Sequence, residues 1–284
     1  MITPDITYGI VLLCIGLIAG LVGALSGLGG AVIITPVLTI LLGLPIQYAA
    51  GTALASSIAT SSGAAATYIK SKITNIKIGM SLEIATTIGV ILGALVAAFA
   101  YSNNLSYLIF IIFGIVMLLS VYPTLKRNRA VHRNRPDSTT KFFQLKGSYY
   151  DRAERKKIDY VGIRWWLGEI VMFVAGWVSG LLGVGSGVLK VLALDTGMRL
   201  PMKVSTATSN FMIGVTAVTG SAIYWALGYI QPIIVAPVII GVVIGSFFGS
   251  MLLERMHSSS IRIIFSAILV IVALEMIVRG VSMI

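Results

Sequence analysis

Two sets of uncharged hydrogen-bond donors lie in otherwise apolar stretches of this chain. The first set is Thr52, Ser56, Ser57, Thr60, Ser61 and Ser62, and the second is Ser205, Thr206, Thr208, Ser209, Asn210 and Thr216. Hydroxyl and amide groups can donate to an oxyanion without placing a fixed charge in apolar surroundings. Thr52, Ser56 and Thr60 are spaced by four and share one helical face. The alternative role is bonding to helix carbonyls or between helices.

A glycine-rich stretch precedes each set, GALSGLGG over residues 23–30 and GLLGVGSG over residues 180–187. Glycine permits positive φ angles and close approach of a ligand to the backbone. Free amides at such a turn, followed by the start of a helix, can bind an anion. Tight packing of helices is the alternative for each stretch alone. The duplication of the stretch, together with the donors that follow it, favours a ligand site.

Lys190 is an ionisable residue within an apolar segment, which by itself suggests a function. It could attract an anion. The chain contains an internal duplication, described below, in which the residue of the other copy that is equivalent to Lys190 (its repeat mate) is Ile34, so the site would be asymmetric. A structural pair with Asp195, or extension of the side chain to the surface, is the alternative. Glu83 and Glu275 are candidates for carrying a coupling proton. The predicted binding residues are Ser26, Gly27, Gly29, Gly30, Thr52, Ser56, Gly183, Gly185, Ser186, Gly187, Lys190, Thr208, Ser209 and Asn210.

No pattern for catalysis, a metal or a cofactor accompanies these residues. His132 and His257 are far apart in sequence, Cys14 is the single cysteine, and neither HExxH nor GxSxG occurs. The net charge of +11 is concentrated in one polar segment without interleaved aromatic motifs, so nucleic-acid binding is not expected. The sequence therefore predicts neither an enzyme nor a nucleic-acid-binding protein.

The elements that position these residues are membrane-spanning helices. The chain is 57% hydrophobic and only 11% charged, with a mean hydropathy of +0.97, so it has too little polar surface for a water-soluble domain. Apolar runs of about 20 residues can each cross the bilayer. The expected segments are 7–25, 31–43, 46–69, 78–101, 105–123, 165–183, 188–197, 203–226, 230–253 and 260–279. We therefore expect an all-α, multi-pass protein of the cell membrane.

The chain contains an internal duplication. Residues 19–68 align without a gap to residues 175–224, with fourteen identical positions in fifty, and a four-residue deletion then restores the register. Duplicated halves with interrupted helices are typical of membrane transporters, whose sites lie where the interruptions meet. The expected domains are a first transmembrane repeat at 1–125, a basic connector at 126–164 and a second transmembrane repeat at 165–284.

The distribution of charge indicates the topology. If each glycine-rich segment crossed the membrane, the two repeats would be parallel. If each instead formed a re-entrant hairpin, the repeats would be inverted, and nineteen of the 21 basic residues, all except Lys190 and Arg279, would share one face. Basic residues mark the cytoplasmic side, so this count favours inverted repeats, a cytoplasmic 126–164 connector and both termini outside. The connector could also contact anionic lipid headgroups.

The motifs resemble those of the sulfite exporter TauE/SafE family, also called toluene-sulfonate uptake permeases. The similarity lies in GLGGAVIITPVL over 27–38 with Gly51-Thr52, and in GVGSGVLKVLAL over 183–194 with Thr208-Ser209. Ser186 replaces a glycine usual in that family, and Leu192 replaces the proline kept as Pro36. The resemblance implies transport of sulfur-containing oxyanions such as sulfite, sulfonates or sulfoacetate.

The combined expectation is a transporter of small anions with its site between the two glycine-rich turns. A carrier of a small carboxylate or other anionic metabolite on the same scaffold is one alternative. A membrane-embedded structural or sensory protein that transports nothing is the other. The anion, the direction of transport, the coupling ion and the oligomeric state are left open by the sequence.

Overall fold

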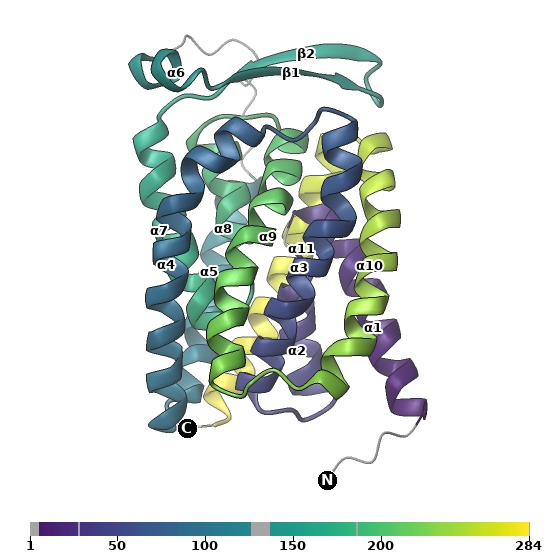
Figure 1. Cartoon of the computed structure of the whole chain (residues 1–284), viewed down its shortest axis with the longest axis vertical. Helices are drawn as coiled ribbons and strands as arrows, with labels where there is room; N and C mark the ends of the chain where they lie inside the picture. Colours follow the sequence, from purple (N-terminus) through teal and green to yellow (C-terminus); the bar gives the residue numbers. More distant parts are fainter. Residues whose placement is uncertain (1–5, 28, 126–136, 186, 284) are drawn as a thin grey trace.

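The computed structural model describes residues 6–27, 29–125, 137–185 and 187–283. In this part, helices form an elongated bundle that is covered at one end by a short β-hairpin (Figure 1). The elements are α1 (Ile6–Ser26), α2 (Ala31–Ile40), α3 (Ile46–Lys70), α4 (Ile76–Ser102), α5 (Ser106–Leu125), α6 (Ser138–Phe143), β1 (Lys146–Asp151), β2 (Lys156–Val161), α7 (Trp165–Leu182), α8 (Gly187–Leu192), a π-helical turn η2 (Ala193–Gly197), α9 (Met202–Ala226), α10 (Pro232–Arg255) and α11 (Ser258–Val281).

Each apolar segment expected from the sequence corresponds to a helix, with 188–197 divided between α8 and η2. Within the described residues, α1, α4, α7 and α10 are long and apolar enough to cross a membrane. They pack in two pairs, α1 against α10 and α4 against α7. Glycines allow this close approach: a Cβ at Gly20 would lie 2.4 Å from the Val242 carbonyl oxygen, and one at Gly93 would lie 2.0 Å from that of Trp177.

Helices α3 and α9 pack against each other inside these pairs, and they begin in the same way. Each follows a proline, Pro45 or Pro201, with φ near −55° and −58° respectively. Proline suits this position because its fixed φ is compatible with a helix start and its missing amide would have no helical partner. The residue before each proline is a leucine whose amide donates to a carbonyl six residues earlier. The Leu44 amide donates to the Leu38 carbonyl at 3.1 Å, and the Leu200 amide donates to the Leu194 carbonyl at 2.9 Å.

A buried tyrosine fixes the far end of each central helix to the preceding broken helix. The Tyr68 hydroxyl donates to the Ala24 carbonyl at 2.9 Å, and the Tyr224 hydroxyl donates to the Gly180 carbonyl at 3.1 Å. Both tyrosines are fully buried. Tyr68 and Tyr224 occupy equivalent positions in the two repeats, and so do their acceptors Ala24 and Gly180. The sequence duplication is therefore also a duplication of local structure.

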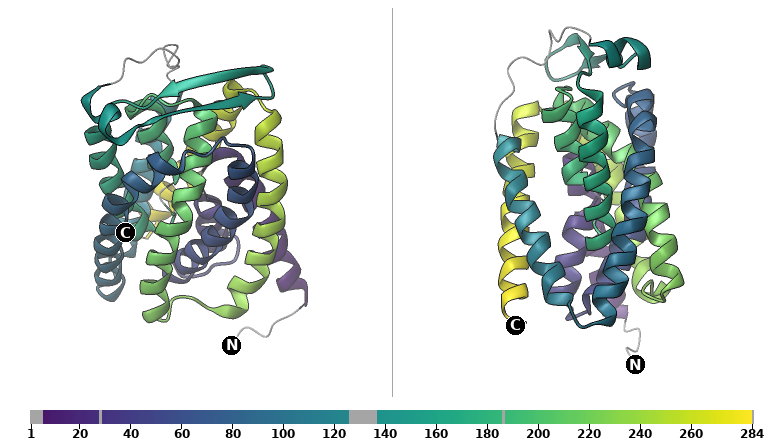
Figure 2. Two further views of the ribbon diagram at one scale, coloured as in Figure 1. Left: turned by 45° about the horizontal axis from the view of Figure 1, so that its top comes forward. Right: turned by 90° about the vertical axis from the view of Figure 1, so that its left-hand side faces the viewer.

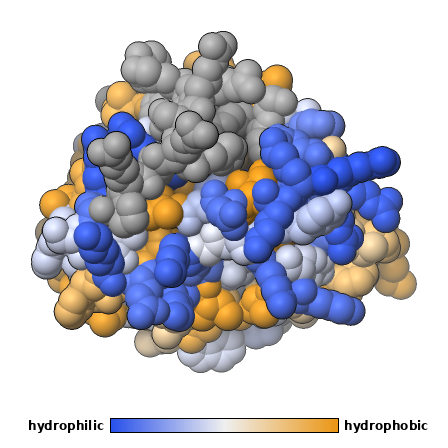
Figure 3. Space-filling model, turned by 90° about the horizontal axis from the view of Figure 1, so that it is seen from above, coloured by the Kyte–Doolittle hydropathy of each residue, from blue (hydrophilic) through white to orange (hydrophobic). Residues whose placement is uncertain are grey.

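The chain path places loops at two ends. The start of α1, the end of α11 and the α2–α3, α4–α5 and α9–α10 connections lie at the lower end of Figure 1. The α3–α4, η2–α9 and α10–α11 connections lie at the upper end, beneath the hairpin. Seen from above, this upper end presents many hydrophilic side chains (Figure 3). Helix α1 starts at the lower end, whereas α7 starts at the upper end (Figures 1 and 2).

The membrane part is helical as expected, but the connector contains a β-hairpin that the sequence did not predict. Strands β1 and β2 are antiparallel, with Lys146 opposite Val161 and Asp151 opposite Lys156, and they lie across the end of the bundle (Figure 2). The inner face of the hairpin buries Tyr149, Ile158 and Tyr160. The alternation that marks such a half-buried strand is only six residues long here. A segment expected to be a polar loop is therefore a folded cover.

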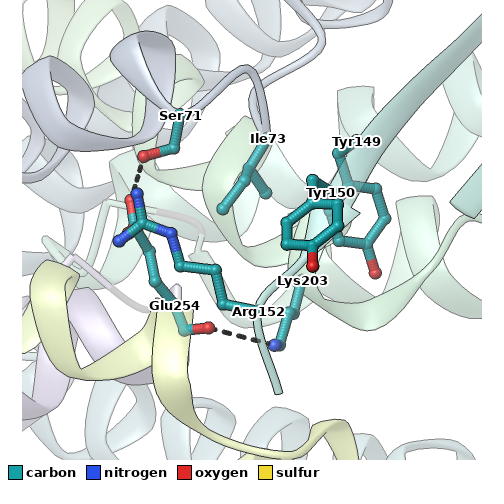
Figure 4. Close-up of a pocket in the computed structure, with 7 residues that line it drawn as sticks. All are labelled: Ser71, Ile73, Tyr149, Tyr150, Arg152, Lys203 and Glu254. Atoms are coloured by element: carbon teal, nitrogen blue, oxygen red, sulfur yellow. Dashed lines mark hydrogen bonds and ion pairs between the residues drawn. The ribbon is translucent and has the colours of Figure 1, made fainter. Parts of the chain in front are cut away.

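Charged groups attach this cover to the bundle (Figure 4). Lys203 at the start of α9 lies 2.9 Å from the Asp151 carboxylate, and both side chains are buried. Arg152 lies 2.7 Å from the carboxylate of Glu254, near the end of α10, which also accepts from the hydroxyl of Ser71. The Asn75 side-chain amide, just before α4, also donates to the Tyr160 hydroxyl at 3.1 Å, so the connector contacts both halves of the chain at one end.

Replacement of Asp151 by Asn should destabilise the protein by about 3 kcal/mol, because it leaves the Lys203 ammonium buried without its counter-charge. Thermal unfolding of the purified protein measures the loss. Glu154→Gln is the matched control in the same hairpin, since its partner Lys156 is more than half exposed, and it should leave the unfolding temperature unchanged. Equal effects of the two substitutions would contradict the role given to Asp151.

The effect of Asp151→Asn should also depend on pH. Burial by itself raises the pKa of the Asp151 carboxyl, but the hydrogen bonds from Lys203 and from the Ala153 and Glu154 amides outweigh it and lower that pKa. A lowered native pKa contributes stability above the unfolded value of about 3.9. This stability disappears as the pH falls through the native pKa. The difference between parent and variant should therefore shrink below about pH 4.

Candidate functional site

Both helices interrupted by glycine end in turns with positive φ angles. In the first half, φ is 77° at Gly27 and 78° at Gly29, and in the second half it is 70° at Gly183 and 69° at Gly185. Residues with a Cβ rarely adopt this conformation. The first turn closes with a hydrogen bond from the Gly27 amide to the Gly23 carbonyl at 2.9 Å. The second closes in the same way, from the Gly183 amide to the Ser179 carbonyl at 2.8 Å. Leu28 and Ser186 lie outside the described residues.

The two turns meet at the middle of the central helices. A Cβ built on Gly29 would lie 3.6 Å from the Ser57 hydroxyl oxygen and 3.0 Å from Ile213, and one built on Gly185 would lie 3.1 Å and 3.4 Å from the same two residues. Ser57 and Ile213 are repeat mates halfway along α3 and α9. The Ser57 hydroxyl donates to the Gly29 carbonyl at 3.1 Å. The structure therefore brings the two glycine-rich turns together.

Each turn also contacts the central helix of the opposite half. A Cβ at Gly27 would lie 3.0 Å from the Thr206 backbone, and one at Gly183 would lie 2.7 Å from the Ala50 backbone. Thr206 and Ala50 are repeat mates. The Ser209 hydroxyl lies 3.0 Å from the Gly27 carbonyl and 3.4 Å from that of Gly187. Residues of the second half thus touch both turns.

The helices that pack against the turns hold buried polar atoms that have no hydrogen-bond partner. Asn210 donates from its side-chain nitrogen to the Ala24 carbonyl at 3.1 Å, while its amide oxygen has no partner. An unpaired polar atom in an apolar interior is costly. Among the described residues, the other unpaired hydroxyls on α2, α3 and α9 belong to Thr35, Thr52, Ser56, Ser205, Thr206 and Ser221. Several of these groups are donors available to a small ligand.

Lys190 and Glu83 form an ion pair inside the bundle. The Lys190 ammonium, 0% exposed, lies 3.5 Å from the Glu83 carboxylate and donates to the Thr216 hydroxyl. Thr216 in turn donates to Glu83 at 2.6 Å. Thr216 lies three residues beyond Ile213 on α9, about one helical turn from the meeting point. Lys190 therefore does not reach the surface, and its partner is on α4.

Other predicted residues lie away from the meeting point or bond elsewhere. The Ser26 hydroxyl donates to Val22 within α1 at 2.7 Å, and the Thr208 hydroxyl accepts from the Asn75 amide, next to the start of α4, at 3.0 Å. Thr52 and Thr208 each lie six residues into central helices that start at opposite ends of the bundle (Figure 1). Glu275 is exposed on α11. These threonines flank the meeting point from opposite ends.

Some residues at the meeting point were not among the predicted binding residues. Ser57 and Ile213 touch both turns, Thr206 adjoins Gly27, and Thr216 joins Lys190 to Glu83. Ser57, Thr206 and Thr216 belong to the two donor sets, so their chemistry was visible. Ile213 was recognisable only as the repeat mate of Ser57. Their contacts depend on how the turns meet the central helices.

Apolar helices that enclose two interrupted helices and a group of buried polar atoms define a multi-pass membrane protein of the transporter type. A model of the family described as Sulfite exporter TauE/SafE matches residues 12–276. The chain belongs to this family and is a membrane transporter.

Curated relatives agree with this class over nearly the whole chain. "Probable membrane transporter protein YunE" of Bacillus subtilis (strain 168) is 29% identical over 279 residues, covering 96% of this chain and 98% of the relative. "Probable membrane transporter protein YdhB" of the same organism is 27% identical, covering 85% and 87%. "Probable membrane transporter protein MJ0441" of Methanocaldococcus jannaschii is 23% identical, covering 93% and 94%. No solved structure matches the chain.

Alanine at Gly183 should destabilise the protein at least twice as much as alanine at Gly228. Both positions have positive φ, 70° and 76°, so both substitutions cost about 1–2 kcal/mol of backbone strain. Only Gly183 is crowded: its Cβ would lie 2.3 Å from the Ala50 Cβ, whereas nothing lies within 4 Å of a Cβ at Gly228. Thermal unfolding of both variants measures the difference. Equal losses would show that the turn does not press on α3.

Proposed function

We propose that this protein transports small sulfur-containing anions, such as sulfite or an organosulfonate, and binds them where the two glycine-rich turns meet. The observation that carries the proposal is the contact of both turns with Ser57 and Ile213 at mid-helix. The description of the family as sulfite exporters supports the substrate class. Gly29, Gly30, Gly185 and Gly187 would offer backbone to the anion.

The chemistry around the turns suits a small oxyanion. The Ser56 and Thr206 hydroxyls are buried donors with no partner, and a bound anion would satisfy them. Hydrogen bonds from neutral donors to an ionised acceptor are stronger than those between neutral groups. Lys190 supplies a positive charge about one turn away, although Glu83 balances it in this structure. An anion site with few fixed charges is compatible with burial inside a membrane protein.

We further propose that the halves are inverted repeats and that α1–α2 and α7–α8 are re-entrant hairpins. The opposite starting ends of α1 and α7 support this arrangement (Figure 1). The basic connector and the other charged loops gather at one end, which we assign to the cytoplasm by the distribution of Lys and Arg. The chain termini would then face outward. The exposed basic residues of the connector could contact anionic lipids.

Sulfur-containing anions should raise the thermal stability of the purified protein, because a ligand that binds the native state stabilises it by mass action. The test measures the unfolding temperature with sulfite, thiosulfate, methanesulfonate and acetate at equal ionic strength. A shift with the sulfur anions alone is the expected result. A shift with acetate alone would favour a carboxylate carrier, and no shift with any of them would overturn the proposal.

Thr206→Val should weaken anion binding about ten- to a hundredfold, since a hydrogen bond to a charged group contributes about 1.5–3 kcal/mol. The fold should remain intact, because the Thr206 hydroxyl has no partner and valine keeps its shape. Thr219→Val is the matched control on the same helix, where the hydroxyl is at the exterior and bonds to its own helix. Equal anion affinities of the two variants would place the site elsewhere. The anion dependence of the unfolding temperature gives both affinities.

Cysteine labelling should distinguish inverted from parallel repeats. With Cys14 replaced, a cysteine at Asn103 or Gly228 should react in sealed cells with an impermeant thiol reagent. A cysteine at Gly197 should react only after the cells are opened, because Gly197 ends η2 and the η2–α9 connection lies at the end that carries the connector (Figure 1). Labelling at Gly197 from outside would contradict the inverted arrangement.

A further inference from the structure

The ion pair between Lys190 and Glu83 occurs in only one half of the duplicated fold. The position of Lys190 is occupied by Ile34 in the first half, and that of Glu83, after the four-residue deletion, by Val235 in the second half. Ile34 and Val235 are buried like their charged mates. The third member of the cluster, Thr216, is matched by Thr60. The positions that hold the ion pair in one half therefore hold buried apolar side chains in the other.

This comparison indicates that the fold does not need the two charges. Removing an ammonium and a carboxylate from water is costly, and replacing a buried ion pair by apolar residues of similar volume is often neutral or stabilising. Here the other half provides the apolar version of the site. A charged pair kept at a place where Ile and Val fit equally well is best explained by what the charges do.

We propose that the Lys190–Glu83 pair couples anion binding to the uptake of one proton. The pair is neutral as a whole, with one ammonium and one carboxylate 3.5 Å apart. An anion that approaches Lys190 from the turns would leave a net negative charge in a water-poor interior, which is unfavourable. Protonation of the Glu83 carboxylate restores neutrality: the proton comes from water, and the anion takes the place of the carboxylate beside Lys190. This inference rests on the proposed anion transport.

The contacts of the pair allow this exchange. Thr216 donates to the Glu83 carboxylate while accepting from Lys190. Its hydroxyl can turn to accept from a protonated Glu83 or to donate to an anion. Both residues of the pair adjoin α9, the helix that carries Ile213 at the meeting point of the turns. The pair and the proposed anion site are therefore neighbours on one helix.

Among the described residues, the other charged side chains on the surrounding helices are not among the partners that the structure gives to the Lys190–Glu83 pair. Helices α7 and η2 pack near the pair. Glu169 on α7 is half-buried, and Asp195 on η2 is buried and interacts with another group of the protein. On α9, Lys203 is paired with Asp151 of the connector. On α4, Lys77 is exposed at the helix start, near Gln144. Lys190 and Thr216 are the polar partners that the structure gives to the Glu83 carboxylate.

The test counts protons taken up when the parent protein binds an anion. Calorimetry in two buffers with different heats of ionisation gives this number. The probes are the monoanions methanesulfonate, which does not titrate near neutral pH, and bisulfite, the form of sulfite at a pH well below its second ionisation. We expect about one proton per anion and an affinity for methanesulfonate that falls about tenfold per unit rise in pH. Binding without proton uptake would overturn this inference alone, whereas no binding of either probe would overturn the proposed function as well.

Two variants assign the proton to Glu83. Glu83→Gln should bind methanesulfonate without proton uptake and with an affinity independent of pH. Glu275→Gln, which changes an exposed glutamate on α11, is the matched control and should behave as the parent does. Proton uptake that persists in Glu83→Gln would overturn the assignment.

A double variant tests whether the charges are dispensable for folding. Lys190→Ile with Glu83→Val copies the other half of the chain. It should unfold at the temperature of the parent or above, yet bind methanesulfonate at least tenfold more weakly. A double variant that fails to fold would overturn the premise that the pair is kept for function. One that folds and binds like the parent, with the same proton uptake, would overturn the coupling.

Discussion

Close backbone contact at glycine is the interaction on which the rest of this structure depends. Where α1 meets α10 and α4 meets α7, glycines such as Gly20 and Gly93 bring the helix backbones together so closely that a Cβ would overlap a carbonyl. Each of these pairs joins one helix from the first half to one from the second. The halves are thereby interlocked. Although α1 and α7 expose apolar side chains such as Ile18 and Ile170, the turns at their ends lie inside the protein against α3 and α9. Interrupted backbone is tolerated in a membrane where protein or a water-filled cavity surrounds it.

The two halves share the residues that determine the backbone conformation and differ in the polar and charged side chains around the turns. The tyrosine bonds, the proline starts of the central helices and the positive-φ glycines are the same in both. Around the meeting point, the mates have diverged: Ser57 corresponds to Ile213, and Lys190 to Ile34. A symmetric scaffold therefore carries asymmetric side chains around the proposed site, which suits a ligand whose charge must be met from one direction.

The sequence was sufficient to predict features that depend on local pattern. The apolar segments, the duplication and the glycine-rich turns follow from composition and periodicity, and the family was recognised from the motifs around Gly27 and Gly183. The pairing of Lys190 with Glu83 could not be predicted in this way, because the partners are far apart in sequence and meet only through the packing of α8 and α4 against α9. The connector hairpin was missed because its alternation is short and its charged residues resemble those of a loop.

The connector has a consequence for movement between the halves. Its Arg152 pairs with Glu254 of α10, which also accepts from Ser71 at the end of α3, and its Asp151 pairs with Lys203 at the start of α9. A rigid-body movement that separated α3 from α10 at this end would break the Glu254 contacts and expose a charged group that is now almost fully buried. If the anion site lies between the turns as proposed, transport requires access to it from each side in turn. The contacts beneath the hairpin are then the ones that such a movement would have to break at the connector end.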